Sequence, residues 1–237
     1  MNDLVIFPKT SGELKASATL DPDVLALKDL LSARSRLVKQ KNSIKVYLSE
    51  LSVSADPDLI KTMTQIHKGT LEAIQTSIKM TEEKIASIIE NNACIKKNYE
   101  LLLSVPGIGR LTALYLIGCT ANFSGKVSGK QLCSYAGVAP FANTSGSSIR
   151  GRNKVHKMAN KELKKLLHMG ALSAIKNYEE FSSYYKRKTA QGKHELLVLN
   201  AIRSKIALRA VAVINNQQAY VDNYKNQKQI AEKISKN

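Results

Sequence analysis

The chain has 237 residues, of which 43% are hydrophobic, and a formal net charge of +17. This length fits one larger domain or two small ones, and so much positive charge, which repels itself, indicates a polyanionic partner. The longest apolar stretches, 111–119 and 206–214, are much shorter than the ~20 residues that span a bilayer. The first twenty residues lack the apolar core of a signal peptide. Composition therefore excludes secretory and membrane-spanning proteins, and we expect no membrane partner and a cytoplasmic location.

The positive charge is concentrated in one part of the sequence. Residues 126–209 hold 17 Lys and Arg against four Glu and no Asp, an excess of 13 positive charges. Between Glu100 and Glu162 there is no carboxylate at all. Clustered cations without acids are typical of a nucleic-acid-binding surface, whereas a merely soluble basic surface would intersperse both signs. We therefore expect DNA as a partner and association with the nucleoid when DNA is bound.

A helical hairpin is predicted over residues 20–95, after a leader over 1–19 that has no helical period. The segments 20–23 and 55–58 share one pattern, in which an Asp caps a helix and a Pro and a second Asp occupy its first turn. Two helices that meet near Ser52–Ala55 form an antiparallel hairpin, or coiled coil. Apolar residues follow a heptad-like spacing along both helices: Leu30, Leu37, Ile44 and Leu51, then Leu71, Ile74, Ile78, Ile85 and Ile88. Such stripes pack on each other or on another chain; both alternatives are open, and we expect a homo-oligomer.

A second, compact domain rich in helix is predicted over residues 96–215, followed by a C-terminal tail over 216–237. The polar, glycine-bearing segment 137–155 is its longest interruption, and few alternating stretches suggest strands. The predicted fold class is therefore mainly α. Helices are expected at about 98–105, 110–118, 128–136, 160–176, 181–189 and 195–215.

The sequence LSVPGIG at 103–109 has the spacing of a helix–hairpin–helix motif. Gly107 and Gly109 permit a sharp turn, and the next helix opens with unpaired backbone N–H groups that can bind a phosphate. Arg110 adds a positive charge at this helix start. A plain connection between two helices would also use glycine, but the acid-free surroundings favour DNA binding.

A second candidate site is the loop that contains NTSGSS at 143–148 and RGRNK at 150–154. A serine can act as the nucleophile that attacks a phosphodiester, while Arg150 and Arg152 neutralise the charge that develops on the phosphorus oxygens. Attack by serine leaves a phosphoserine link, which conserves the bond energy for rejoining. The alternative is a phosphate-binding loop that does no chemistry, and spacing alone favours this alternative.

Other basic residues would extend the contact with the nucleic-acid backbone. We expect this role for Lys154, Lys157, Lys161 and Lys164. On the helix 160–176, Lys161, Lys164, Lys165 and His168 share a face opposite Leu163, Leu166 and Leu167. Tyr184-Tyr185 precedes a basic run, but the histidine and arginines of a tyrosine recombinase are not arrayed around it, so these tyrosines are expected to pack or to stack on bases.

The joint pattern of these segments resembles one known family. The segments are Leu103–Gly109, Phe123, Leu132–Pro140, Thr144–Gly146, Arg150–Arg152 and Met158–Lys161. They resemble, over about 96–215, the C-terminal transposase domain of the bridge-RNA-guided insertion-sequence transposases, and the hairpin before them resembles that family's coiled-coil segment. The resemblance implies site-specific recombination in DNA transposition, with a structured guide RNA and a multimeric DNA synapse. In that family the serine before the loop glycine is the strand-exchange nucleophile, and Ser145 is the matching residue.

Members of that family also carry an N-terminal resolvase-like (RuvC-type) nuclease domain, whose carboxylate cluster binds metal ions. The sequence begins at about the point where that domain should end, and after Asp58 the only aspartate is Asp222. We therefore expect a truncated or split transposase with no cofactor on this chain, no metal-binding residues and no activity alone. A divalent metal such as Mg²⁺ is expected only with the missing domain. The alternatives are a non-catalytic nucleic-acid-binding remnant of a transposase and an oligomerisation module.

Overall fold

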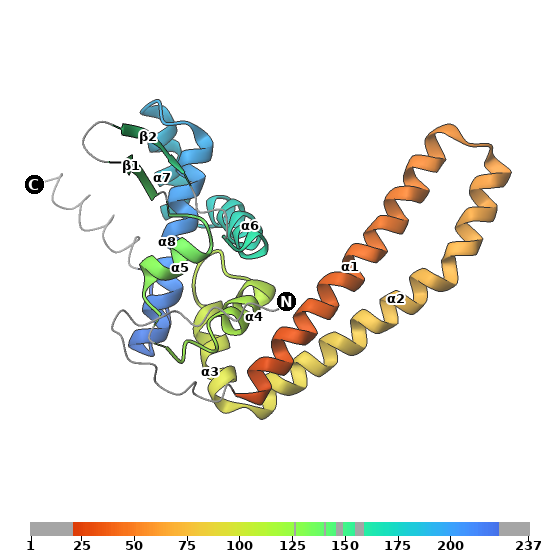
Figure 1. Cartoon of the computed structure of the whole chain (residues 1–237), viewed down its shortest axis with the longest axis horizontal. Coiled ribbons are helices and arrows are strands. Elements are labelled where there is room, and N and C mark those ends of the chain that lie inside the picture. The colour runs from red at the N-terminus through yellow and green to blue at the C-terminus, as the bar shows by residue number, and fades with distance from the viewer. Residues whose placement is uncertain (1–20, 126, 140, 146–148, 155–158, 223–237) are drawn as a thin grey trace, which may run out of the picture. The chain divides into compact units, whose positions relative to one another are not determined.

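The computed structural model describes residues 21–222 except 126, 140, 146–148 and 155–158 (Figure 1). Its described part contains eight helices and one two-stranded antiparallel sheet, so the fold is mainly α as predicted. The described residues up to Lys96 form one compact unit, and those from Lys97 onward form another. The leader over 1–19 and the tail beyond 222 lie outside the described residues. No helix in the described part of the chain has both the length and the hydropathy needed to cross a bilayer.

The first unit is the predicted helical hairpin, formed by α1 (Pro22–Ser54) and α2 (Pro57–Asn91). Both helices start as the sequence indicated. The Asp21 carboxylate accepts a hydrogen bond from the Asp23 backbone N–H at 2.9 Å, and the Asp56 carboxylate accepts one from Asp58 N–H at 3.1 Å. Because each cap satisfies an N–H group that a helix start leaves free, the two starts are set by local sequence.

The apolar stripes of α1 and α2 face each other. Packing is tightest near the two chain ends of the hairpin, where the buried residues are Val24, Leu27 and Leu31 of α1 and Ile78, Ile85, Ile88 and Ile89 of α2. Farther along, the heptad residues Leu37, Ile44, Leu51, Leu71 and Ile74 are half-buried. Packing within one chain therefore covers the apolar stripes where α1 begins and α2 ends. Along the remainder of the two helices it covers them only partly.

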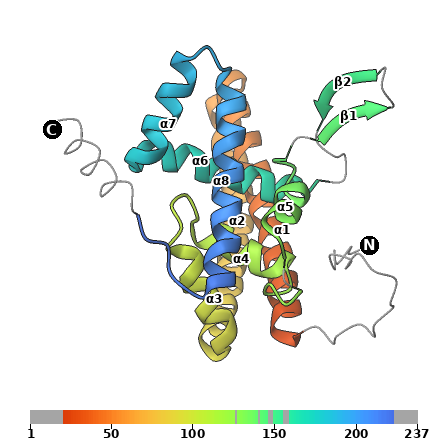
Figure 2. The ribbon, with the colours of Figure 1, turned by 90° about the vertical axis from the view of Figure 1, so that its left-hand side faces the viewer.

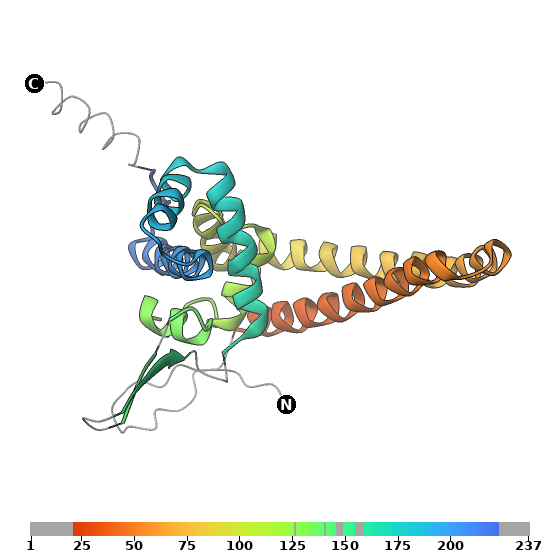
Figure 3. The same ribbon diagram turned by 90° about the horizontal axis from the view of Figure 1, so that it is seen from above.

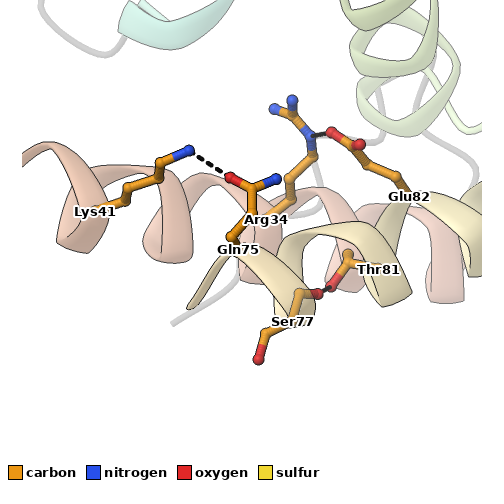
Figure 4. Close-up of polar contacts among 6 residues, drawn as sticks. All are labelled: Arg34, Lys41, Gln75, Ser77, Thr81 and Glu82. Atoms are coloured by element: carbon orange, nitrogen blue, oxygen red, sulfur yellow. Dashed lines mark hydrogen bonds and ion pairs between the residues drawn. The ribbon is translucent and has the colours of Figure 1, made fainter. Parts of the chain in front are cut away.

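Two polar pairs join α1 to α2 along the same hairpin (Figure 4). The Arg34 guanidinium forms an ion pair with Glu82 at 2.7 Å, and Lys41 donates a hydrogen bond to the Gln75 side-chain oxygen. The Thr81 hydroxyl bonds back to the Ser77 carbonyl of its own helix at 2.8 Å. Polar pairs at fixed positions in an apolar stripe favour one register of the two helices over others.

The second unit is built around α8 (Glu195–Asn216). This helix buries apolar residues along its whole length, and α5 (Gly129–Tyr135), α6 (Lys161–Asn177) and α7 (Glu179–Ala190) pack against it. α6 crosses α8, as Figures 2 and 3 show. α3 (Ala93–Leu103) and α4 (Arg110–Cys119) precede this group, and α4 packs against α6. All six helices predicted for this part of the chain are present, although α3 begins earlier and ends earlier than expected.

The segment 137–155, expected to be irregular, contains a β-hairpin. Strand β1 (Phe141–Ser145) pairs with β2 (Ile149–Lys154) in antiparallel register, and the hairpin projects from the helices of its unit (Figure 3). Sequence patterns missed it because FANTS and IRGRNK lack the alternation of apolar and polar residues that marks a half-buried strand.

Candidate nucleic-acid interface

The β-hairpin is anchored at both ends to helices of its own unit. Before β1, the Val138 carbonyl accepts hydrogen bonds from two α8 side chains, Asn200 Nδ2 at 2.7 Å and Ser204 Oγ at 3.0 Å. After β2, Asn160 caps α6; its backbone N–H donates to the Tyr135 carbonyl at 2.8 Å and its Nδ2 to the Tyr135 hydroxyl at 2.9 Å. The packed helices therefore hold both ends of an otherwise projecting hairpin.

Strand pairing brings Ser145, the candidate nucleophile, and Arg150, a candidate phosphate-binding residue, to the same end of the hairpin. Ser145, the last residue of β1, lies opposite Ile149, and Thr144 lies opposite Arg150. Directly opposed residues of an antiparallel pair have Cα atoms about 4.5–5.5 Å apart, so the backbones of Ser145 and Arg150 are close neighbours. Arg152 follows on the same strand.

The other loop residues lie apart from this end. Lys154 pairs with Phe141 at the far end of the hairpin, and the register between them and Ser145 contains an irregularity. Lys157 and the two serines after Gly146 lie outside the described residues. The structure thus brings together part of the predicted set.

The turn between α3 and α4 uses its two glycines in different ways. Gly107 has a positive φ of 86°, and a Cβ there would come within 2.8 Å of the Gly170 carbonyl on α6 and 2.7 Å of the Ile206 side chain. Gly107 therefore permits close packing inside the unit. Gly109 caps α4 in extended conformation, and a Cβ there would meet nothing within 4 Å. Its exposed neighbour Arg110 donates from Nε to the Tyr99 hydroxyl at 3.3 Å.

One face of α6 is basic and the other is buried, as the sequence indicated. Lys161 and Lys165 are exposed and Lys164 is half-buried, whereas Leu163 and Leu167 are fully buried. Leu166, expected among the core residues, is only half-buried. The half-buried His168 has a buried Nδ1 without a hydrogen-bond partner among the described residues.

A cluster on α7 and α8 joins Tyr184 and Arg187, which belong to the tyrosine pair and the basic run noted in the sequence, to Lys205, which no sequence pattern singled out. The Lys205 ammonium lies 4.2 Å from the centre of the Tyr184 ring, and the Arg187 guanidinium lies 5.8 Å from it. Burial lowers the pKa of Lys205, an effect that Glu180 partly offsets. Cation–π pairs of this kind are frequent in folded proteins and stabilise packing. The available signal was a set of basic residues, Arg203, Lys205 and Arg209, inside an otherwise apolar helix.

Arg209 stabilises the same region. It pairs with Glu180 at 2.5 Å and lies over the rings of Phe181 and Tyr220, at 4.9 and 4.8 Å from their centres. The Tyr220 hydroxyl also donates to Glu180, at 3.3 Å. The guanidinium is thus paired and stacked, which makes it a structural residue of the second unit.

Cys133 is the buried cysteine of the described region and serves packing. Its Sγ donates to the Ser204 carbonyl at 3.7 Å, and burial raises the pKa of its thiol to about 11. At neutral pH the thiol stays protonated and is therefore a poor nucleophile. Among the described residues, no group of three His, Cys, Asp or Glu side chains is placed to hold a metal ion.

Comparisons with known proteins match the part of the chain that carries this geometry. Residues 99–186 match the family model described as Transposase IS116/IS110/IS902 family. The pilin gene-inverting proteins of Moraxella bovis and Moraxella lacunata are each 27% identical over 214 residues, which cover 90% of the chain and 61% of each relative. The insertion element IS110 uncharacterized 43.6 kDa protein of Streptomyces coelicolor is 28% identical over 148 residues, 59% of the chain and 36% of that relative. The chain thus spans about three fifths of the length of the two pilin gene-inverting proteins.

Proposed function

We propose that this chain, whose residues 99–186 carry a transposase domain of the IS116/IS110/IS902 family, is a DNA recombinase that acts through Ser145. The domain implies transposition or recombination as the function and DNA as the partner. The observation that supports Ser145 is its place at the end of β1, next to the Thr144–Arg150 pair of an anchored hairpin. A nucleophile needs such fixed geometry, because small displacements from the attacking position cost much of the rate.

In the proposed reaction the Ser145 oxygen attacks the phosphorus of a DNA phosphodiester. A bond from phosphorus to the serine oxygen forms while the bond to one deoxyribose oxygen breaks. The serine loses its proton and the leaving oxygen takes one up, so no water is consumed and the step can be reversed on a new strand. Arg150 and Arg152 would neutralise charge on the remaining phosphorus oxygens.

The basic surface around the hairpin would bind the DNA backbone on either side of the reacting phosphate. Exposed Lys161 and Lys165 lie on α6, which begins directly after the hairpin's second anchor, Asn160. Arg110 at the exposed start of α4 would add a contact through its charge and the free N–H groups of the helix start. A guide RNA and an assembly of several chains belong to the same proposal.

The proposed reaction also needs divalent metal ions, as the family resemblance implies. They would be held by carboxylates of a resolvase-like domain, and the residues described here would bind and position DNA. The decisive assay therefore compares the chain alone with the chain joined to such a domain from the same family.

The test is the formation of a covalent DNA–protein adduct on supercoiled or RNA-paired target DNA in the presence of Mg²⁺. We expect an adduct with the joined domain, located at Ser145 by peptide mass. Ser145→Ala should abolish the adduct and leave DNA affinity nearly unchanged, because removing one hydroxyl takes away no charge.

Ser148→Ala is the matched control, since it removes a nearby hydroxyl and should keep the adduct. Attachment at another serine or at a tyrosine would refute the assignment of Ser145. Tight DNA binding without any adduct would instead leave the chain as the non-catalytic binding module, the second candidate function.

A further inference from the structure

Arg203 is a buried arginine that has no ion-pair partner among the described residues. Only 8% of its surface is exposed, and its Nε has no hydrogen-bond partner among the described residues. No described carboxylate forms an ion pair with it, and burial lowers the pKa of its guanidinium without an opposing charge to offset the effect. On the same helix, the charge of Arg209 is compensated by an ion pair with Glu180, as is usual for a partly buried arginine.

A guanidinium buried in this way is unfavourable for folding. Among the described residues its Nε gains no compensating hydrogen bond and the group gains no ion pair, and it cannot lose its proton at neutral pH. Replacing it with an apolar side chain of similar length should therefore favour the folded state. An arginine that the fold does not need for stability requires another explanation.

Arg203 lies on the part of α8 that anchors the β-hairpin. Its chain neighbour Ser204 and Asn200, one turn earlier, both donate hydrogen bonds to Val138, three residues before β1. These three α8 residues lie within about one helical turn, so the backbone of Arg203 is beside the root of the hairpin that carries Ser145.

We propose that Arg203 binds a phosphodiester group of the nucleic acid at the root of the β-hairpin. This inference rests on the proposed function, because it needs nucleic acid bound at the hairpin. A guanidinium presents several N–H donors in a planar fork, which suits two oxygens of one phosphate. The sequence between Glu100 and Glu162, which includes the β-hairpin, contains no carboxylate, so the hairpin itself offers no acid to pair with Arg203.

The test uses Arg203→Met and Arg203→Lys in the full chain, with Arg209→Met as the control on the same helix. Arg203→Met removes the charge and retains most of the volume, so the melting temperature of the free protein should rise. Affinity for nucleic acid should fall about tenfold, the effect of losing a hydrogen bond between charged groups. The log–log salt slope of DNA binding should also flatten by about one.

The two other variants separate a ligand contact from a structural role. Arg203→Lys keeps the charge without the fork, so its affinity should lie between those of the wild type and Arg203→Met. Arg209→Met should lower the melting temperature, because it leaves Glu180 without its partner. Duplex DNA and single-stranded RNA are titrated separately, and a loss for either supports the phosphate contact and identifies its source.

Two results would overturn the inference. One is an Arg203→Met protein that binds both nucleic acids as tightly as the wild type, and the other is one that is less stable or unfolded. If the wild type itself shows no salt-dependent binding to either nucleic acid, the proposed function fails as well. Failure of the Arg203 inference can therefore be told apart from failure of the proposed function.

Discussion

At the scale of single residues, two backbone segments of the second unit approach so closely that only glycine fits at the point of contact. A Cβ on Gly170 would lie 2.1 Å from the Gly107 carbonyl oxygen, and a Cβ on Gly107 would lie 2.8 Å from the Gly170 carbonyl oxygen. The two backbones, one from the α3–α4 turn and one from α6, touch because both residues lack side chains. The glycine in the turn therefore serves packing as well as turning.

Because of this contact, we expect one added methyl group at Gly170 to lower the free energy of unfolding substantially. Gly170→Ala should destabilise the protein by about 1–3 kcal/mol or more, since the clash is with backbone that cannot move aside. Gly125→Ala is the control in the same unit, because its Cβ would meet nothing within 4 Å. Both are measured by chemical denaturation, and equal stability of the two variants would show that the close approach is relieved at no cost.

At the scale of elements, the β-hairpin carries the residues to which the proposed reaction assigns a role. It combines the transposase-like serine with Arg150 and Arg152, and its anchors come from α8 and α5. These strands are short, and a two-stranded hairpin is marginally stable by itself, so we expect its position to depend on its anchors.

The arginines of β2 should contribute to the salt dependence of DNA binding. If about six phosphates are engaged, the log–log slope for duplex DNA should be near −5. Changing Arg150 and Arg152 together to Ala should flatten it by about two, as measured by fluorescence anisotropy. The control is the double change of Lys39 and Lys45 to Ala, two exposed residues of α1. Equal flattening by both pairs would indicate a general charge effect, and no change would place the binding surface elsewhere.

At the scale of the whole molecule, the helical hairpin has apolar surface that its own packing leaves uncovered. Val53 is 87% exposed and Ile66 is 60% exposed, on opposite helices on either side of the Ala55–Asp56 connection. Other exposed apolar residues of the hairpin are Val46, Tyr47, Leu59 and Met80. The proposed assembly of several chains would cover these side chains.

We expect a segment of residues 20–96 to associate in solution. Sedimentation should give a mass above that of the monomer at tens of micromolar, because association covers the remaining apolar residues. Changing Val53 and Ile66 together to Ser should reduce this association and leave helix content unchanged, since both side chains are exposed in the monomer. A well-folded wild-type segment that stays monomeric would place any contact between chains elsewhere.

The amino-acid sequence by itself determined the helices and the region of the site. Caps such as Asp21 and Asp56, heptad spacing and helix-breaking glycines act over a few residues, so they can be recognised before any fold is known. The acid-free basic segment and the ordered motifs around Ser145 likewise indicated a transposase-like domain, which the match over residues 99–186 supports.

Only the tertiary structure decided which of these residues pair, pack or remain unpaired. Val138 and Ser204 are 66 positions apart, Glu180 and Arg209 are 29 apart, and the contact between Gly107 and Gly170 joins two distant segments. Arg203 and Arg209 look alike in the sequence of α8, yet Arg209 is paired with Glu180, whereas Arg203 has no ion-pair partner among the described residues. Such differences arise from long-range packing, which brings the Glu180 carboxylate to Arg209 and buries Arg203.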